Sequence, residues 1–165
     1  MKQVKKLFFV AMASLFFNAS FAQMEDTKMV GGAAMYPSKD IISNAVNSKD
    51  HTTLVAAVKA ADLVSTLQSA GPFTVFAPTN EAFSLLPAGT VDNLVKPENK
   101  KMLTGILTYH VVAGRISSAD LMKMIREGNG NATLKTVAGE NLIAMMKGNK
   151  IVLKDTKGGL SFITI

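Results

Sequence analysis

The chain of 165 residues contains no cysteine, no tryptophan and only two histidines. Without cysteine it can form no disulfide, no thiolate nucleophile and no cysteine-ligated metal site. The two histidines, His51 and His110, are far apart in the sequence, and neither belongs to a His-x-x-x-His pair or a triad pattern. The sequence therefore offers no thiol chemistry, and the fold must depend on its hydrophobic core.

Long apolar runs are also missing, apart from one near the start. Residues 1–6 include three lysines, residues 7–17 form an apolar run, and Ser20 and Ala22 have the spacing that a signal peptidase recognises. The apolar run is too short for an ordinary membrane span. We predict a signal peptide over residues 1–22, cleavage after Ala22, and a secreted or periplasmic product without stable membrane insertion.

The positive charge is smaller than it first looks. The formal net charge is +6, but the predicted signal peptide carries three lysines and no acidic residue, so the mature chain would carry +3. This modest charge argues against a nucleic-acid partner. The remaining 143 residues suit one domain, which would bury roughly 68–70% of its unfolded surface.

Residues 23–37 contain Gly31-Gly32 and show no helical or strand periodicity. We predict that this segment is a flexible leader between the signal peptide and the domain.

The most informative pattern follows Gly71-Pro72. Phe73–Ala77 is an unbroken apolar or β-branched run, which predicts a strand buried on both faces. Pro78 ends the strand, because proline has no N–H for a ladder, and Thr79 is a good helix N-cap. A short helix should then run to Pro87.

Helices are predicted on both sides of this strand, and strands only near the end. Ser38, Thr90 and Ser117 are predicted helix caps, the last with Asp120 in a capping-box-like start. Two-residue alternation then predicts a meander of four strands over residues 133–137, 141–146, 151–154 and 160–165. Helices first and a strand meander later indicate an α+β fold.

Four segments resemble the fasciclin (FAS1) domain. They are Leu54–Val58, Phe73–Phe83, Leu85–Thr90 and Leu107–Gly114 with its Tyr109-His110 pair. The resemblance covers about residues 38–165. It implies a wedge of two small β-sheets flanked by a cluster of helices, and membership of a group of secreted or surface-attached adhesion and matrix-binding modules.

One departure from the family pattern concerns the end of the chain. A FAS1 domain usually closes with an Asn-Gly turn and a further apolar strand, whereas this sequence stops at Ile165. The resemblance therefore predicts a domain that is incomplete at its C-terminus, with the last strand missing and a ladder edge left open.

The resemblance also points to candidate binding residues. These are Thr79 and Asn80 in the segment Phe73–Phe83, and Tyr109 and His110 in the segment Leu107–Gly114. The family uses the Tyr-His pair as a packing and stability element, so we expect a structural role for His110, with partner binding as the lesser possibility. No catalytic or metal-binding residues are predicted.

We therefore expect a non-enzymatic, exported cell-surface module that recognises a surface or matrix protein or a carbohydrate, without a cofactor. The oligomeric state stays open. One alternative is a small-molecule carrier with an apolar pocket between helices and sheet. A metal-assisted hydrolase is the other, and it would need His51, His110 and a carboxylate close to one point.

Overall fold

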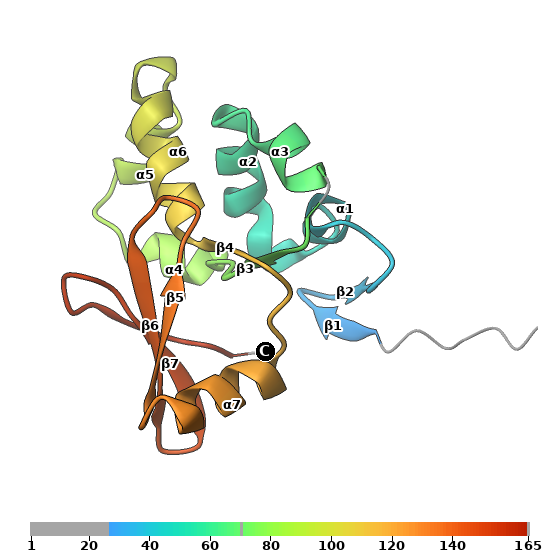
Figure 1. Ribbon diagram of the computed structural model, residues 1–165. Helices are drawn as coiled ribbons and strands as arrows, with labels where there is room; N and C mark the ends of the chain where they lie inside the picture. Colours follow the sequence, from blue (N-terminus) through green and yellow to red (C-terminus); the bar gives the residue numbers. More distant parts are fainter. Residues whose placement is uncertain (1–26, 70, 165) are drawn as a thin grey trace, which may run out of the picture.

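The computed structural model describes residues 27–69 and 71–164, so the predicted signal peptide and its cleavage site lie outside the described residues. Figure 1 shows helices gathered in the upper part of the molecule and a four-stranded antiparallel sheet with one helix in the lower part. A two-stranded sheet lies where the two parts meet. The arrangement is α+β, as predicted.

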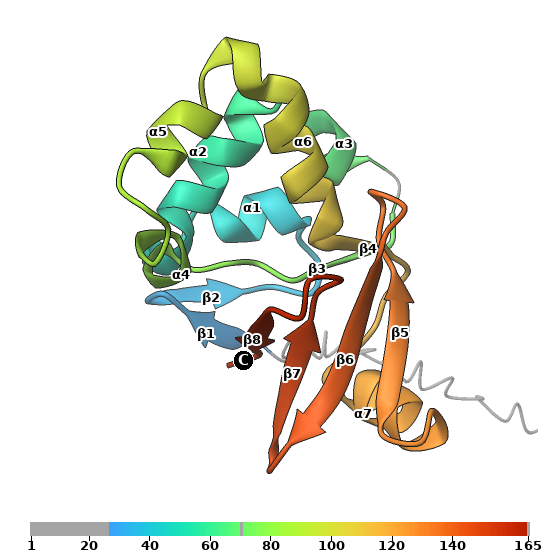
Figure 2. The same ribbon diagram turned by 90° about the vertical axis from the view of Figure 1, so that its left-hand side faces the viewer.

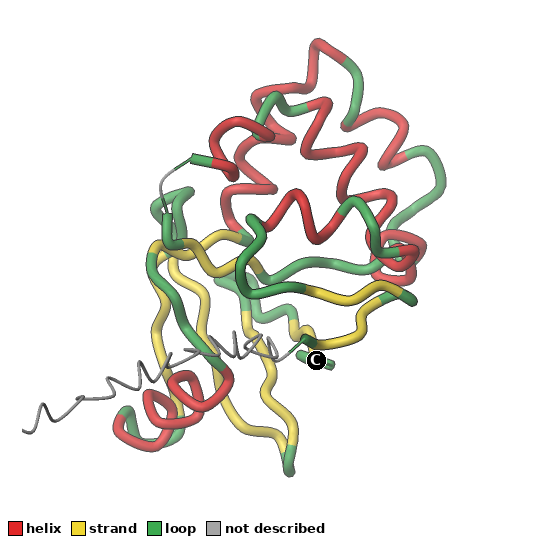
Figure 3. The backbone as a smooth tube through the Cα atoms, turned by 90° about the vertical axis from the view of Figure 1, so that its right-hand side faces the viewer, coloured by secondary structure: helices red, strands yellow, loops and turns green. Residues whose placement is uncertain are grey.

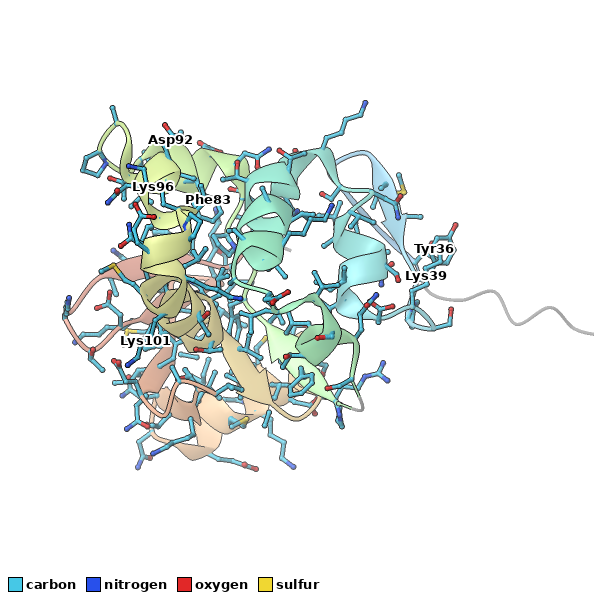
Figure 4. All side chains as sticks on the ribbon, turned by 90° about the horizontal axis from the view of Figure 1, so that it is seen from above. Tyr36, Lys39, Phe83, Asp92, Lys96 and Lys101 are labelled. Atoms are coloured by element: carbon cyan, nitrogen blue, oxygen red, sulfur yellow. The ribbon has the colours of Figure 1, made fainter. Side chains whose placement is uncertain are left out.

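The upper part is a layer of short helices around one hydrophobic core (Figure 3). Helices α2 (Thr52–Ala60) and α6 (Lys100–Tyr109) contact each other, and Phe83 packs against the same core (Figure 4). The other elements of the layer are α1 (Ile41–Ala45), the 3-10 turn η1 (Lys49–His51), α3 (Val64–Gln68), α4 (Asn80–Ser84), α5 (Thr90–Leu94) and the 3-10 turn η2 (Pro97–Asn99).

Two of the predicted caps in this layer are wrong. Asp40, not Ser38, is the N-cap of α1, and its carboxylate accepts a 2.9 Å hydrogen bond from the Ser43 N–H. Thr90 is the first helical residue of α5, and Gly89 is its N-cap with a φ of 78°. A left-handed backbone of this kind favours glycine. The N-cap of α5 is therefore Gly89, one residue before the predicted Thr90.

The lower part contains the four predicted strands. Its strands β5 (Asn131–Lys135), β6 (Asn141–Lys147), β7 (Lys150–Lys154) and β8 (Leu160–Phe162) lie in sequence order, each antiparallel to the next. Alternate burial is clear in β5 and in the first half of β6, whereas β7 buries two consecutive residues and β8 is exposed. Figure 2 shows α7 (Ser118–Glu127) behind this sheet. The side chains between the helix and the sheet form a second core.

The start of α7 is fixed by the capping box that the sequence indicates. The Ser117 Oγ accepts a 3.1 Å hydrogen bond from the Asp120 N–H, and the Asp120 carboxylate accepts a 2.9 Å bond from the Ser117 N–H. These hydrogen bonds satisfy two N–H groups that the helix itself leaves free. The hydrogen bonds from Ser117 also lower the pKa of the Asp120 carboxyl.

Between the two cores lies the sheet of β3 (Phe73–Val75) and β4 (Val111–Ala113), paired antiparallel with Thr74 opposite Val112. A strand at this place is confirmed, but burial on both faces is wrong. All three β3 residues are half-buried and Ala77 is exposed. The reason is that β3 has one neighbour, β4, within residues 27–69 and 71–164, so it is an edge strand.

The predicted flexible leader is also corrected where it is described. Residues 28–35 form a hairpin of β1 (Lys28–Val30) and β2 (Ala33–Met35). Gly31 and Gly32 make its turn, with φ values of 57° and 78°. Two positive φ values match the hairpin turns that follow the natural strand twist.

This hairpin is tied to the helical layer. The Gly31 carbonyl accepts a 3.0 Å hydrogen bond from the Lys49 N–H, and a Cβ on Gly31 would collide with the Ser48 hydroxyl. The Asn44 side chain bonds both the N–H and the carbonyl of Tyr36 at 2.9 Å. The Lys39 ammonium lies 4.4 Å from the centre of the Tyr36 ring (Figure 4).

The lower core gives the first prediction. Ile125 on α7 is 2% exposed, and Ile125→Ala should lower the free energy of unfolding by about 2–5 kcal/mol, because it removes buried methyl groups and leaves a cavity. Urea unfolding followed by circular dichroism measures this loss. Met122 on the same helix is 37% exposed, and Met122→Ala should cost no more than about 0.5 kcal/mol. Equal losses would contradict the assignment of the buried face.

Candidate functional site

Asn80 stands at the junction of three elements and uses its side chain to hold them. Its Oδ1 accepts hydrogen bonds from the Thr53 N–H at 3.0 Å and from the Thr52 hydroxyl at 3.2 Å. Its Nδ2 donates to the Lys49 carbonyl at 2.8 Å. The residue at the N-cap of α2, His51, makes no capping bond with its own side chain. Asn80 therefore supplies the cap of α2 from a distant part of the sequence.

Thr79, the residue before Asn80, caps the helix that follows it. Its hydroxyl accepts a 3.3 Å hydrogen bond from the Ala82 N–H, which caps α4 as the sequence predicts. Because Thr79 fixes the start of α4 and Asn80 joins α4 to α2, the pair determines how the chain leaves β3.

Tyr109 ties the helical layer to the lower sheet. Its hydroxyl donates a 3.1 Å hydrogen bond to the Asn141 carbonyl at the start of β6. Burial raises the pKa of Tyr109; Thr156 opposes the shift, and the carboxylates of Asp155 and Glu140 add to it. The neutral phenol is therefore the form that the fold favours.

His110 is bonded to its own helix. Its Nδ1 lies 2.8 Å from the Ile106 carbonyl, and a carbonyl can only accept, so Nδ1 carries the proton. Its ring meets the Tyr109 ring edge to face at a centroid distance of 6.0 Å. His110 also lines an apolar pocket, which Thr79, Asn80 and Tyr109 do not.

The four predicted residues thus do not converge on one point. Asn80 and Thr79 organise the start of two helices, Tyr109 reaches the lower sheet, and His110 faces the pocket. Their polar groups bond the protein's own backbone. A ligand would have to compete with those bonds, so these residues support the surface around them.

Sequence reasoning missed a serine–histidine pair. The Ser48 Oγ and the His51 Nδ1 lie 2.9 Å apart, a distance suited to a nucleophile and its base. Ser48 is, however, only 2% exposed and His51 only 8%, so a substrate has no access to the hydroxyl. The pair lies under the turn of the β1–β2 hairpin, where it has a structural role. A Ser-x-x-His spacing was the only available signal.

An apolar pocket lies between the helices and the β3–β4 sheet. Helices α1, α2, α3 and α6 form its walls, and Phe73, Val75 and Val111 come from the β3–β4 sheet. Its volume is about 50 Å³, and apart from Thr66, Thr108 and His110 its lining is apolar. A cavity of roughly 150 Å³ holds benzene, and this one is about a third of that volume, which is small for a lipid or a similar carried molecule.

The pocket lies on the face of the β3–β4 sheet that also faces the upper core. Successive strand residues point to opposite faces, so Phe73 and Val75 face the helices and Thr74 faces the lower part. The Thr74 hydroxyl donates to the Gly114 carbonyl at 2.7 Å and accepts from the Ile116 N–H at 2.9 Å. Phe76, which follows the strand, packs against the lower core.

Metal-binding and membrane-spanning features are not found in the part of the chain that the structure describes. No three His, Cys, Asp or Glu side chains gather there in a way that could hold a metal ion. Among those same residues, every helix is too short or too polar to cross a bilayer.

Comparisons of the sequence with known proteins find a matching family model and several similar proteins. The family model of the Fasciclin domain matches residues 49–161. Protein sll1483 of Synechocystis sp. is 46% identical over 135 residues, which cover 80% of this chain and 71% of that protein.

Two mycobacterial proteins are also similar. Immunogenic protein MPB70 of Mycobacterium bovis is 43% identical over 112 residues, 65% of this chain and 52% of that protein. Cell surface glycolipoprotein MPB83 of the same species is 43% identical over 98 residues, 59% of this chain and 40% of that protein. The chain thus spans about half the length of these two relatives.

The role of Asn80 is tested by removing its side chain. Asn80→Ala should lower the free energy of unfolding by about 1–3 kcal/mol, because it removes a helix cap and two further hydrogen bonds. Asn80→Asp is the matched control: it keeps the oxygen that accepts from Thr53 and should lose less. Urea unfolding measures both losses, and an Asn80→Ala protein as stable as the parent would refute the capping role.

The raised pKa of Tyr109 gives a prediction at alkaline pH. The unfolded chain loses the phenolic proton first, near pH 10, so stability should fall as the pH rises from that value through the higher pKa of the folded protein. Tyr109→Phe should be less stable at neutral pH by about 0.5–1.5 kcal/mol, since it lacks the bond to Asn141, yet it should lose less on going to pH 11. Unfolding curves at pH 8 and pH 11 test this, and parallel losses in both proteins would contradict it.

Proposed function

This chain belongs to the fasciclin family, and from that premise we propose that it is a non-enzymatic, exported binding module of the cell-surface and adhesion type. Its partner is a surface or matrix protein or a carbohydrate. The predicted signal peptide would direct it out of the cytoplasm, to the periplasm or beyond.

The observation that carries the proposal is the apolar pocket between the helices and the β3–β4 sheet. The pocket offers apolar surface with hydrogen-bonding groups at its side, which suits the binding of another molecule. The relative named a cell surface glycolipoprotein supports a location at the cell surface.

The candidate residues take different parts in this function. His110 would contribute to the contact through the pocket wall. Thr79, Asn80 and Tyr109 would act by keeping α4, α2 and β6 in place around it, since their side chains bond the backbone of those elements.

Neither alternative is favoured by a specific observation. The metal-assisted hydrolase would need His51, His110 and a carboxylate close to one point, and no group of three such side chains that could hold a metal ion lies within residues 27–69 and 71–164. A small-molecule carrier would need a larger cavity than about 50 Å³.

A binding experiment with an envelope extract tests the proposal. The full chain, immobilised on beads, should retain a component of the extract saturably, and free protein in excess should release it. Digestion of the extract with a protease, or oxidation of its sugars with periodate, should abolish retention and so identify the partner as protein or carbohydrate.

The Thr79→Ala/Asn80→Ala double variant serves as the control for the residues at the start of α4. Studied below its unfolding temperature, it should still retain the component, because these residues are proposed to act through the fold. Loss of retention by the folded variant would instead show direct contact. Failure of the parent protein to retain anything beyond the level of an unrelated protein of equal charge would overturn the proposed function.

A further inference from the structure

One face of the lower sheet is not covered by any helix within residues 27–69 and 71–164. Helix α7 packs against the opposite face, which carries Leu134, Leu142 and Leu153. Successive strand residues point to opposite faces, so the alternate residues of β5, β6 and β7 point away from α7. Figure 2 shows this second face toward the viewer, with α7 behind the sheet. We call it the outer face.

Four lysines lie on the outer face: Lys135, Lys147, Lys150 and Lys154. They stand at three levels along the strands. Lys135 is opposite Asn141, and Lys154 is opposite Ile143. Lys147 and Lys150 are opposite each other, next to the β6–β7 turn. Asn141 and Lys147 lie at the two ends of β6, so at about 3.4 Å per residue the lysines extend over about 20 Å.

The charge of these lysines is not compensated within the described chain. None of the four forms an ion pair with an acidic side chain there. The acidic residues next to these strands, Glu140 and Asp155, lie at the far end from Lys147 and Lys150 and act on Tyr109. Like charges directly opposite each other destabilise a sheet, so the Lys147–Lys150 pair costs the fold free energy that an anionic ligand would return.

The other exposed side chains that β5, β6 and β7 present on this face are polar. They are Asn131, Thr133 and Asn141. The apolar residues between them are withdrawn from solvent, since Ile143 and Met145 are half-buried and Val152 is completely buried. Exposed apolar side chains of the described outer face are confined to its margin, at Leu160 and Phe162 of β8. Its centre therefore offers ammonium, amide and hydroxyl groups and little apolar area.

We propose that the outer face of β5, β6 and β7 binds a linear anionic polysaccharide. The four lysines donate charge-assisted hydrogen bonds to the acidic groups of the polymer, and the amide and hydroxyl side chains between them bond its hydroxyls. The inference adds a second binding surface to the proposed function, on which it rests only for the export that would bring the protein to such a polymer. It does not involve the apolar pocket.

The composition of the face favours this occupant over a protein or a membrane. Protein interfaces are depleted in lysine and bury an apolar centre, whereas the centre of this face has its valine, Val152, already buried. A surface that lies in a membrane inserts exposed apolar side chains, which here are confined to β8. A polysaccharide is bound through charge and hydrogen bonds, which are the groups that the face presents.

Isothermal titration calorimetry with two polymers of sugar acids is the direct test. Polygalacturonate carries carboxylates and dextran sulfate carries sulfates, and neutral dextran is the matched control. At least one anionic polymer should bind at about 50 mM salt and weaken strongly at about 0.5 M, because salt screens exposed charges. Neutral dextran should not bind, and equal binding of all three polymers would contradict recognition by charge.

A pair of double variants locates the site. Lys147→Gln/Lys150→Gln should weaken binding of the anionic polymer roughly tenfold or more, where tenfold is the equivalent of about 1.4 kcal/mol. Lys96→Gln/Lys101→Gln removes the same charge from exposed lysines of the helical layer (Figure 4) and should bind nearly like the parent. Equal weakening in both variants would show that net charge alone attracts the polymer, and would overturn the site.

Urea unfolding of the same variants separates binding from folding. At low salt and without polymer, Lys147→Gln/Lys150→Gln should unfold at a higher urea concentration than the parent, because the repulsion across the ladder is gone. Its weaker binding then cannot come from a damaged fold. A lower unfolding midpoint in this variant would contradict the repulsion on which the inference depends.

The remaining outcomes assign the face to another partner or to none. Tighter binding of single-stranded DNA or of phosphatidylserine vesicles than of either polymer, lost in the Lys147→Gln/Lys150→Gln variant, would overturn the polysaccharide in favour of that partner. If neither anionic polymer binds while the immobilised parent still retains an envelope component, the inference is refuted and the proposed function stands.

Discussion

The pairing of β3 with β4 is the contact on which both halves of the molecule depend. This ladder has a core on each side: Val111 lines the pocket on the helical side, and Val112 belongs to the core of the four-stranded sheet. The isolated bridge between Val112 and Thr136 then joins the ladder to the strand meander. Loss of this pairing would remove a sheet that contributes side chains to both cores.

Asn80 and Tyr109, two of the residues to which the family resemblance points, hold the elements next to this ladder in place. Asn80 caps α2 from outside, just after the chain leaves β3, and Tyr109 reaches across to β6 just before the chain enters β4. Both residues follow or precede the Val75–Val111 end of the ladder, and they connect that end to the helical layer and to the lower sheet.

Much of this architecture could be predicted from local sequence. The Ser117–Asp120 capping box depends on interactions within a few residues, and the alternate burial of β5 follows a simple period. The β1–β2 hairpin could not be predicted in the same way, because its position depends on Ser48 and Asn44, which lie far from Gly31 and Tyr36 in the sequence. The burial of β3 was overestimated because an apolar run does not show how many neighbours a strand has, and the pocket is assembled from segments of the chain that lie far apart.

The claim that one ladder unites the two cores is tested most directly by following each core separately during unfolding. NMR signals of Leu103 in the upper core and of Leu134 in the lower core can be recorded across a urea titration. The account predicts coincident midpoints for the two residues, with the amide of Val112 exchanging only through global unfolding. Distinct midpoints, with one core still folded after the other is lost, would contradict it.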